Sequence, residues 1–175
     1  YELLQEQEER DVRMDPRSVI LAISDVTAEN VEEVSSVLRA SNVTATLFIA
    51  SKDVGIDGIT QQQLVTLVAN GFDIQSATHT NEDLRALTNA QIDLELKQSR
   101  RILEEITNET VLAVSYPWGG VNERVSSKAE ENGYLFGVGS KNDRSFARNQ
   151  FLSLPSVHVN SDMTAEDIVT ALTAE

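Results

Sequence analysis

The chain has 175 residues, which suits one domain with a substantial hydrophobic core, since a chain of this size buries roughly 70% of its extended surface on folding. Its 14 Lys and Arg against 28 Asp and Glu give a net charge of -14, which repels phosphate backbones and excludes nucleic acid from the expected partners. No cysteine is present for disulfides or thiol chemistry, and no run approaches the roughly 20 apolar residues of a membrane span, so we expect no membrane insertion.

The beginning of the chain is charged and has little to bury. Residues 1–17 contain one adjacent apolar pair, Leu3 and Leu4. We therefore predict a charged arm or linker over residues 1–17 and one folded domain over residues 18–175. The chain starts at Tyr1 with neither an initiator methionine nor a basic and apolar signal region, and we expect a mature or excised piece.

Short apolar runs recur at intervals through the domain. The first is continuous, which is typical of a strand covered on both faces. The runs predict six strands, over residues 19–23, 44–50, 72–76, 111–115, 134–138 and 151–159, the last of them broken by Pro155.

Helical signals lie between these runs. Threonines stand where helices should begin, and Asn-Gly pairs stand where helices should end. The predicted caps are Thr27, Thr60, Thr88 with Gln91, and Thr164 with Asp167, and the predicted ends are Asn70-Gly71 and Asn132-Gly133. Strands that alternate with helices predict an α/β fold with a mostly parallel sheet, either a barrel or an open doubly wound sheet.

Ligands of such folds bind at the carboxyl ends of the strands. The candidates at these ends are Asp25, residues 77–83, residues 116–122 and His158. In residues 115–122, Ser-Tyr-Pro-Trp-Gly-Gly-Val-Asn, the only tryptophan of the chain is followed by two glycines that allow a close approach to the backbone. This stretch is either a ligand site or a strand-to-helix turn with a core aromatic.

These segments resemble the motifs of the polysaccharide deacetylase domain, the NodB-type carbohydrate esterase fold. Residues 22–26, Ala-Ile-Ser-Asp-Val, are similar to T-F-D-D-G, and residues 76–84 are similar to S-H-T-x-x-H-P-D-L. Residues 115–122 resemble A-Y-P-Y-G-x-Y-N, and residues 154–157 resemble L-P-R-I. The resemblance implies a distorted (β/α) barrel of about six to seven mostly parallel strands that removes acetyl groups from glycans.

The resemblance does not extend to the catalytic groups. The family uses an aspartate as general base, and a second aspartate with two histidines as ligands of a divalent metal. Here the base position is Ser24, Asp25 keeps the first ligand position, and the histidine positions are Ala77 and Asn81. The arginine of the late motif is replaced by Ser156.

A shift of two residues gives an alternative. It places His79 and Asp83 as an H-T-x-x-D motif, so that Asp25, His79 and Asp83 would bind a divalent metal such as zinc. The opposing interpretation makes His79 a solvated loop residue and Asp25 a helix-cap carboxylate. A general base would still be absent.

The sequence therefore predicts a deacetylase-like domain without catalysis and without a bound metal. It would bind a glycan through Asp25, Tyr116, Trp118 and His158, or serve in a larger extracellular or cell-surface assembly. Tyr116 and Trp118 offer flat apolar faces for a sugar ring. The alternative is a metal-dependent polysaccharide deacetylase with a remodelled metal site.

Overall fold

The computed structural model describes residues 19–24, 26–55, 58–139 and 147–173. The predicted arm over residues 1–17 lies outside the described residues, as does Asp25. The description below concerns these ranges.

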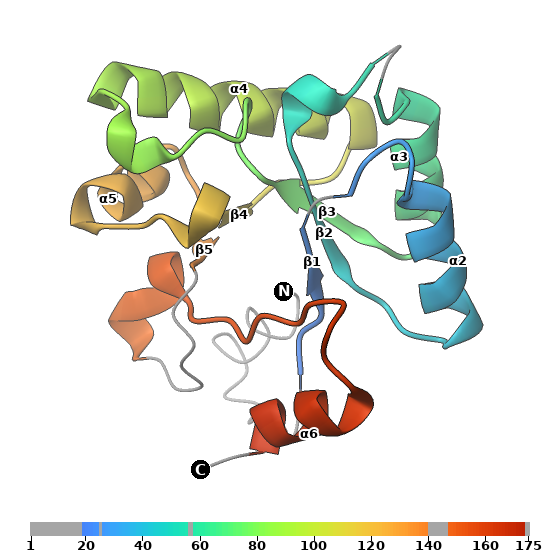
Figure 1. The fold of residues 1–175 in the computed structure, drawn as a ribbon. Helices are drawn as coiled ribbons and strands as arrows, with labels where there is room; N and C mark the ends of the chain where they lie inside the picture. Colours follow the sequence, from blue (N-terminus) through green and yellow to red (C-terminus); the bar gives the residue numbers. More distant parts are fainter. Residues whose placement is uncertain (1–18, 25, 56–57, 140–146, 174–175) are drawn as a thin grey trace.

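Five parallel strands form one sheet in the order β1-β2-β3-β4-β5, which confirms the α/β prediction. The strands are β1 (Ala22–Ile23), β2 (Thr46–Ile49), β3 (Asp73–Ser76), β4 (Ala113–Ser115) and β5 (Phe136–Val138). The sheet curls into a half-barrel, and its helices form an arc around the outside (Figure 1). The expected distorted barrel is therefore present, with five strands in place of six to seven.

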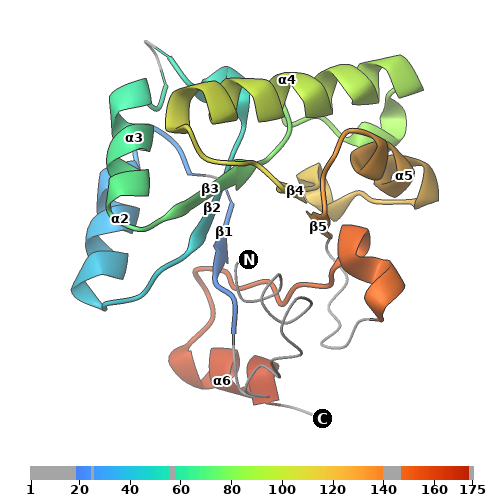
Figure 2. The ribbon, with the colours of Figure 1, turned by 180° about the vertical axis from the view of Figure 1, so that it is seen from behind.

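Helices connect the strands. They are α2 (Val31–Ala40), α3 (Gln61–Ala69), α4 (Asn89–Thr107), α5 (Glu123–Glu131) and α6 (Ala165–Thr173). Short 3-10 turns complete the loops: η1 (Ser51–Asp53), η2 (Leu84–Ala86), η3 (Pro117–Gly119) and η4 (Arg148–Ser153). Seen from both sides, α6 lies apart from the other helices, and none of its residues is buried (Figure 2). No helix in the described ranges has the length and apolar content that a membrane span requires.

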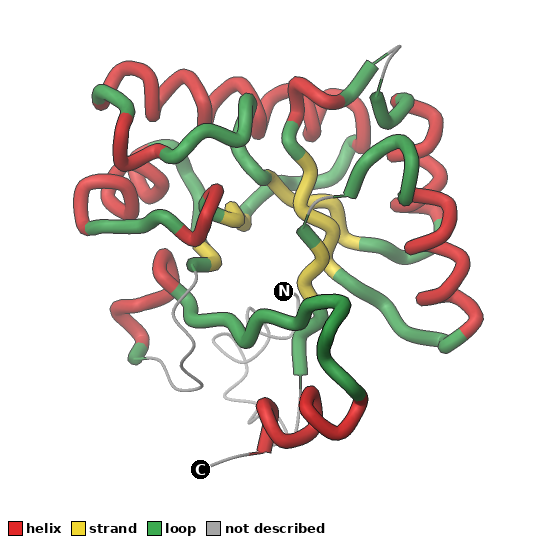
Figure 3. Tube along the Cα trace, viewed as in Figure 1, coloured by secondary structure: helices red, strands yellow, loops and turns green. Residues whose placement is uncertain are grey.

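The predicted sixth strand is the main error of the sequence analysis (Figure 3). Phe151 belongs to η4, and only Leu154 forms a bridge, with Val138 of β5. The Leu154 backbone N–H donates to Gly137 O at 2.7 Å, and the Gly139 N–H donates to Leu154 O at 2.9 Å. At the next pairing position the Ser156 hydroxyl donates to Gly139 O at 2.7 Å in place of a backbone N–H, so the pairing stops there.

Side-chain caps fix most helix starts as predicted. Thr60 with Gln63 and Thr88 with Gln91 form complete capping boxes. Before α2, however, the side chain of Asn30 accepts a bond from the Thr27 N–H at 2.8 Å, so a turn precedes the helix and Asn30 is its N-cap residue.

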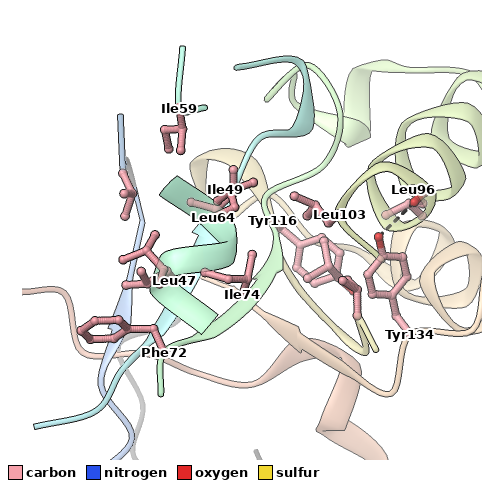
Figure 4. Close-up of a cluster of buried hydrophobic side chains, with 14 of the residues drawn as sticks. Leu47, Ile49, Ile59, Leu64, Phe72, Ile74, Leu96, Leu103, Tyr116 and Tyr134 are labelled. Atoms are coloured by element: carbon pink, nitrogen blue, oxygen red, sulfur yellow. Dashed lines mark hydrogen bonds between the residues drawn. The ribbon is translucent and has the colours of Figure 1, made fainter. Parts of the chain in front are cut away.

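Alternation along the strands sends side chains to the two faces of the sheet. On the outer face, Leu47, Ile49 and Ile74 pack under the helices (Figure 4). Two fully buried tyrosines extend this core, and Tyr134 donates its hydroxyl to Leu96 O of α4 at 3.0 Å (Figure 4). A smaller group faces the other way, and we call it the inner apolar cluster: Phe48, Ala113 and Phe136, with Ala77, Val138, Phe151 and Leu154 packed against them.

Gln75 bridges a gap in the sheet. β3 and β4 share a single register pair, Ser76 with Val114. The buried Gln75 side chain spans the gap: its Oε1 accepts from the N–H groups of Leu112 at 2.8 Å and Ala113 at 2.7 Å. Its Nε2 donates to the carboxylate of Asp73 at 2.7 Å. A side-chain amide thus replaces the backbone ladder between these strands.

Gln75→Met should destabilise the protein by about 1–3 kcal/mol, because it leaves the N–H groups of Leu112 and Ala113 buried without an acceptor. Urea unfolding followed by circular dichroism measures this change. Gln62→Met is the matched control on the exposed face of α3 and should stay within about 0.5 kcal/mol of wild type. Equal stabilities of the two variants would contradict the bridging role.

Candidate functional site

Three loops meet at the carboxyl ends of β2, β3 and β4. The loop after β2 begins with η1, and the loop after β3 covers residues 77–83. Their backbones are joined where the Ser51 N–H donates to Thr78 O at 3.2 Å and the Lys52 N–H donates to His79 O at 3.0 Å. The third loop, after β4, carries η3.

Trp118 is presented to solvent by η3. The residue is 81% exposed and has a left-handed backbone with φ 58°. The turn is closed on either side, since Gly119 N–H donates to Tyr116 O at 2.8 Å and Gly120 N–H donates to Pro117 O at 2.9 Å. A non-glycine residue at positive φ is uncommon and costs roughly 1–2 kcal/mol. Of the two interpretations of this stretch, the core aromatic is therefore wrong for Trp118.

Tyr116 is buried, although the sequence predicts that it binds a sugar. It follows Val114 on the outer face of the sheet and is 2% exposed. Its hydroxyl donates to Leu152 O at 2.9 Å, and burial raises the pKa of the phenol well above its usual range. Tyr116 is therefore a core residue and cannot stack on a sugar.

The other predicted binding residues are more scattered. Ser24, at the position of the family's base, is exposed after β1. Asp25 lies outside the described residues, so its predicted roles stay predictions. His158 was expected on the sixth strand, but it lies beyond Pro155 in an exposed segment without regular structure. No strand therefore orients its imidazole.

The segment after β3 is backbone-strained and offers no ligand where the family has its first histidine. Ala77 continues β3, its N–H donating to Ile49 O at 2.9 Å, and its methyl group packs against the inner apolar cluster. Thr78 is fully buried with φ 65°, and Asn81 has φ 62°. A β-branched residue in this region costs about 1–3 kcal/mol, and such strain persists only where the surroundings impose it.

His79 is fixed on two sides. Its Nδ1 lies 2.8 Å from the Oγ of Ser51, whose residue is 2% exposed. Its backbone N–H donates to the carboxylate of Glu95 at 2.9 Å. His79 is half-buried, so it is not the solvated loop residue of the opposing interpretation.

Glu95 imposes the conformation of this loop. The carboxylate lies on the buried face of α4, where its Oε2 accepts from the N–H groups of His79 and Thr80, and its Oε1 accepts from the Thr80 hydroxyl at 2.7 Å. The sequence analysis missed this residue. The signal was present, because Glu95 lies within the buried stripe that Ile92, Leu96 and Leu103 form along α4, and a buried carboxylate requires partners.

Asp83 pairs with Arg85. Its Oδ2 lies 2.7 Å from Arg85 Nη2, and its Oδ1 accepts from Arg85 Nε at 2.9 Å and from the Arg85 backbone N–H at 3.0 Å. The side-chain hydrogen bond from Arg85 holds the pKa of the Asp83 carboxyl below its usual range. A Cβ on Gly120 would lie 2.7 Å from Asp83 Oδ1 and from Arg85 Nε, so the pair packs directly against the loop that carries Trp118.

The described residues do not fit the metal site of the family. Ala77 supplies no donor atom, and the Asp83 carboxylate of the alternative set is taken by Arg85. Within the ranges described above, which omit Asp25, no three His, Cys, Asp or Glu side chains converge.

Comparisons with known proteins point to the same family that the sequence motifs resemble. A family model described as polysaccharide deacetylase matches residues 11–137. The Bacillus subtilis protein YxkH, a polysaccharide deacetylase by name, is 25% identical over 156 residues, which cover 89% of this chain and 56% of that protein. The chain thus spans little more than half the length of this relative.

Two solved structures show the same fold. The Streptococcus pyogenes deacetylase PplD, in complex with acetate, superposes with a TM-score of 0.88 at 20% identity, covering 98% of this chain and 77% of that one. A Bacillus anthracis pseudoenzyme of the same esterase family superposes with a TM-score of 0.61 at 18% identity, covering 70% and 43%. The fold therefore occurs with and without catalysis.

Glu95→Gln should destabilise the protein by about 1.5–3 kcal/mol, since the amide would turn an N–H group toward the donors of the loop. Hydrogen exchange of the His79 and Thr80 amides should accelerate. Glu105→Gln, on the exposed face of α4 beside Arg101, is the matched control and should cost no more than about 0.5 kcal/mol. Unchanged exchange at both amides would show that Glu95 does not hold the loop.

Proposed function

The chain belongs to the polysaccharide deacetylase family, and from that premise we propose that it is a member without catalytic activity that binds a glycan at the carboxyl ends of its strands. The observation that carries the proposal is the 81% exposure of Trp118, beside a loop whose catalytic positions hold Ala77 and Asn81. The proposed location is the cell surface or the extracellular space, where structural polysaccharides are accessible.

The residue types argue against acetyl transfer to water. Deacetylation requires a base to activate water and an electrophile to polarise the carbonyl. The Ser24 hydroxyl has no useful proton affinity near neutral pH, and the methyl group of Ala77 packs among apolar side chains. The two carboxylates that the structure engages beside these loops are already occupied, since Glu95 accepts three hydrogen bonds from the loop and Asp83 is paired with Arg85.

The geometry supports sugar binding. An indole offers a large, rigid apolar face that matches the C–H face of a pyranose ring. The exposure of Trp118 also costs conformational free energy, because the residue has a left-handed backbone in η3. A chain that used this tryptophan only for packing would bury it.

Isothermal titration calorimetry with N-acetylated chitohexaose should show binding that Trp118→Ala weakens about tenfold or more, the loss expected when a ring no longer buries its surface. Leu135→Ala is the control, since Leu135 is a large exposed side chain (47%) just before β5, near the opposite end of the strands. If Trp118→Ala binds as wild type does, Trp118 is only a scaffold residue.

Acetate release tests the absence of catalysis. The wild-type protein should release no acetate from chitohexaose with added zinc, cobalt or nickel. The triple variant Ser24→Asp, Ala77→His, Asn81→His should bind zinc stoichiometrically by plasma mass spectrometry and begin to release acetate. A mutant of the Bacillus anthracis pseudoenzyme is described as having restored enzymatic activity, which supports this design. Stoichiometric zinc and turnover in the wild-type protein would overturn the proposal in favour of a remodelled metal site.

A further inference from the structure

The Asp83–Arg85 pair is more accessible than a purely structural ion pair needs to be. The Asp83 side chain is 31% exposed and the Arg85 side chain is 48% exposed. An exposed pair of this kind contributes little to stability, with a median near 0–1 kcal/mol in measured cases. Its exposed polar atoms are accessible to a ligand.

The pair is held in a fixed position. Asp83 caps η2 through the Arg85 N–H, and Arg124 of α5 donates from Nη2 to the Arg85 backbone carbonyl at 2.9 Å. Arg124 also donates to Leu87 O at 2.8 Å. The guanidinium and carboxylate thus rest on a backbone that two elements hold, which lowers the entropy lost when they bind a ligand.

The same pair adjoins the tryptophan loop. Both side chains pack against Gly120, two residues from Trp118, where any larger residue would collide with them. The charged pair therefore packs against the loop that presents the exposed Trp118, which follows β4.

The pair keeps unused hydrogen-bonding capacity. Arg85 Nε and Nη2 donate to Asp83, whereas Nη1 has no hydrogen-bond partner in the part of the chain that the structure describes. Each Asp83 oxygen has further acceptor capacity toward solvent. A donor and an acceptor lie side by side, which matches two polar groups on adjacent ring carbons of a sugar, each of which both donates and accepts.

The charge of the protein further restricts the class of glycan that this surface can bind. The pair is neutral as a unit, and the chain carries a net charge of -14, which disfavours acidic glycans. We infer that Asp83 and Arg85 form the polar half of the glycan-binding surface whose apolar half is Trp118, and that this surface selects a neutral sugar through adjacent hydroxyl groups. The inference rests on the proposed function, and it adds two specificity-determining residues and the class of ligand.

Calorimetry with chitohexaose and with its per-O-methylated form tests this inference, because methylation removes the hydroxyl donors and keeps the ring faces. Wild-type protein should prefer the unmethylated hexamer. Arg85→Gln should weaken binding of both hexamers about tenfold, the effect of one charge-assisted hydrogen bond, because a methyl ether oxygen still accepts. Asp83→Asn, which keeps the shape and a cap acceptor, should weaken binding of the unmethylated hexamer alone, because it removes one of the acceptors for the sugar hydroxyl groups.

Arg101→Gln is the matched control, since Arg101 forms an exposed pair with Glu105 on α4. If Arg85→Gln and Asp83→Asn both bind the two hexamers as tightly as wild type does, the inference is overturned and the proposed function is left intact. An equal loss for both hexamers in Asp83→Asn would also overturn it, because the carboxylate would then only support the Trp118 loop. Failure of wild-type protein to bind either hexamer would refute the proposed function itself, and the inference with it.

Discussion

The sheet depends on one side-chain amide. β4 carries the Trp118 loop at its end, yet a single backbone register pair joins it to β3. Gln75 supplies the missing connection by accepting from two β4-side N–H groups while it donates to Asp73, which in turn accepts from Thr46 of β2 at 3.0 Å. The chain of bonds crosses three strands on the inner face.

Strain is concentrated where a ligand would bind. Thr78, Asn81 and Trp118 all have positive φ, and they lie in the two loops that follow β3 and β4. Glu95, Ser51 and Arg124 fix those loops by hydrogen bonds from other elements. A backbone of this kind is costly, and here it accompanies Ala77 and Asn81 at the positions where the family motif has histidines. Strain in these loops supports the proposal that they form a binding surface.

Local signals in the sequence were sufficient for much of the fold. Five apolar runs became strands, and the Thr60 and Thr88 capping boxes formed because each depends on residues three positions apart. The sixth strand failed, since apolar content alone does not reveal that the Ser156 hydroxyl takes the place of a backbone bond to Gly139. Tyr116 was misassigned because a two-residue period gives alternation but not which face is covered. The Asp83–Arg85 contact with Gly120 depends on packing between loops some 35 residues apart, which no local pattern encodes.

The exposure of Trp118 also determines what its fluorescence reports. The chain has no other tryptophan, and this indole is already in water in the folded state. Unfolding changes its surroundings little, so its emission is a poor measure of stability, and backbone signals must serve that purpose. A sugar ring that covers the indole removes water from it without unfolding anything. Under the proposed function, the fluorescence of Trp118 therefore reports ligand at one loop and is nearly independent of the state of the core.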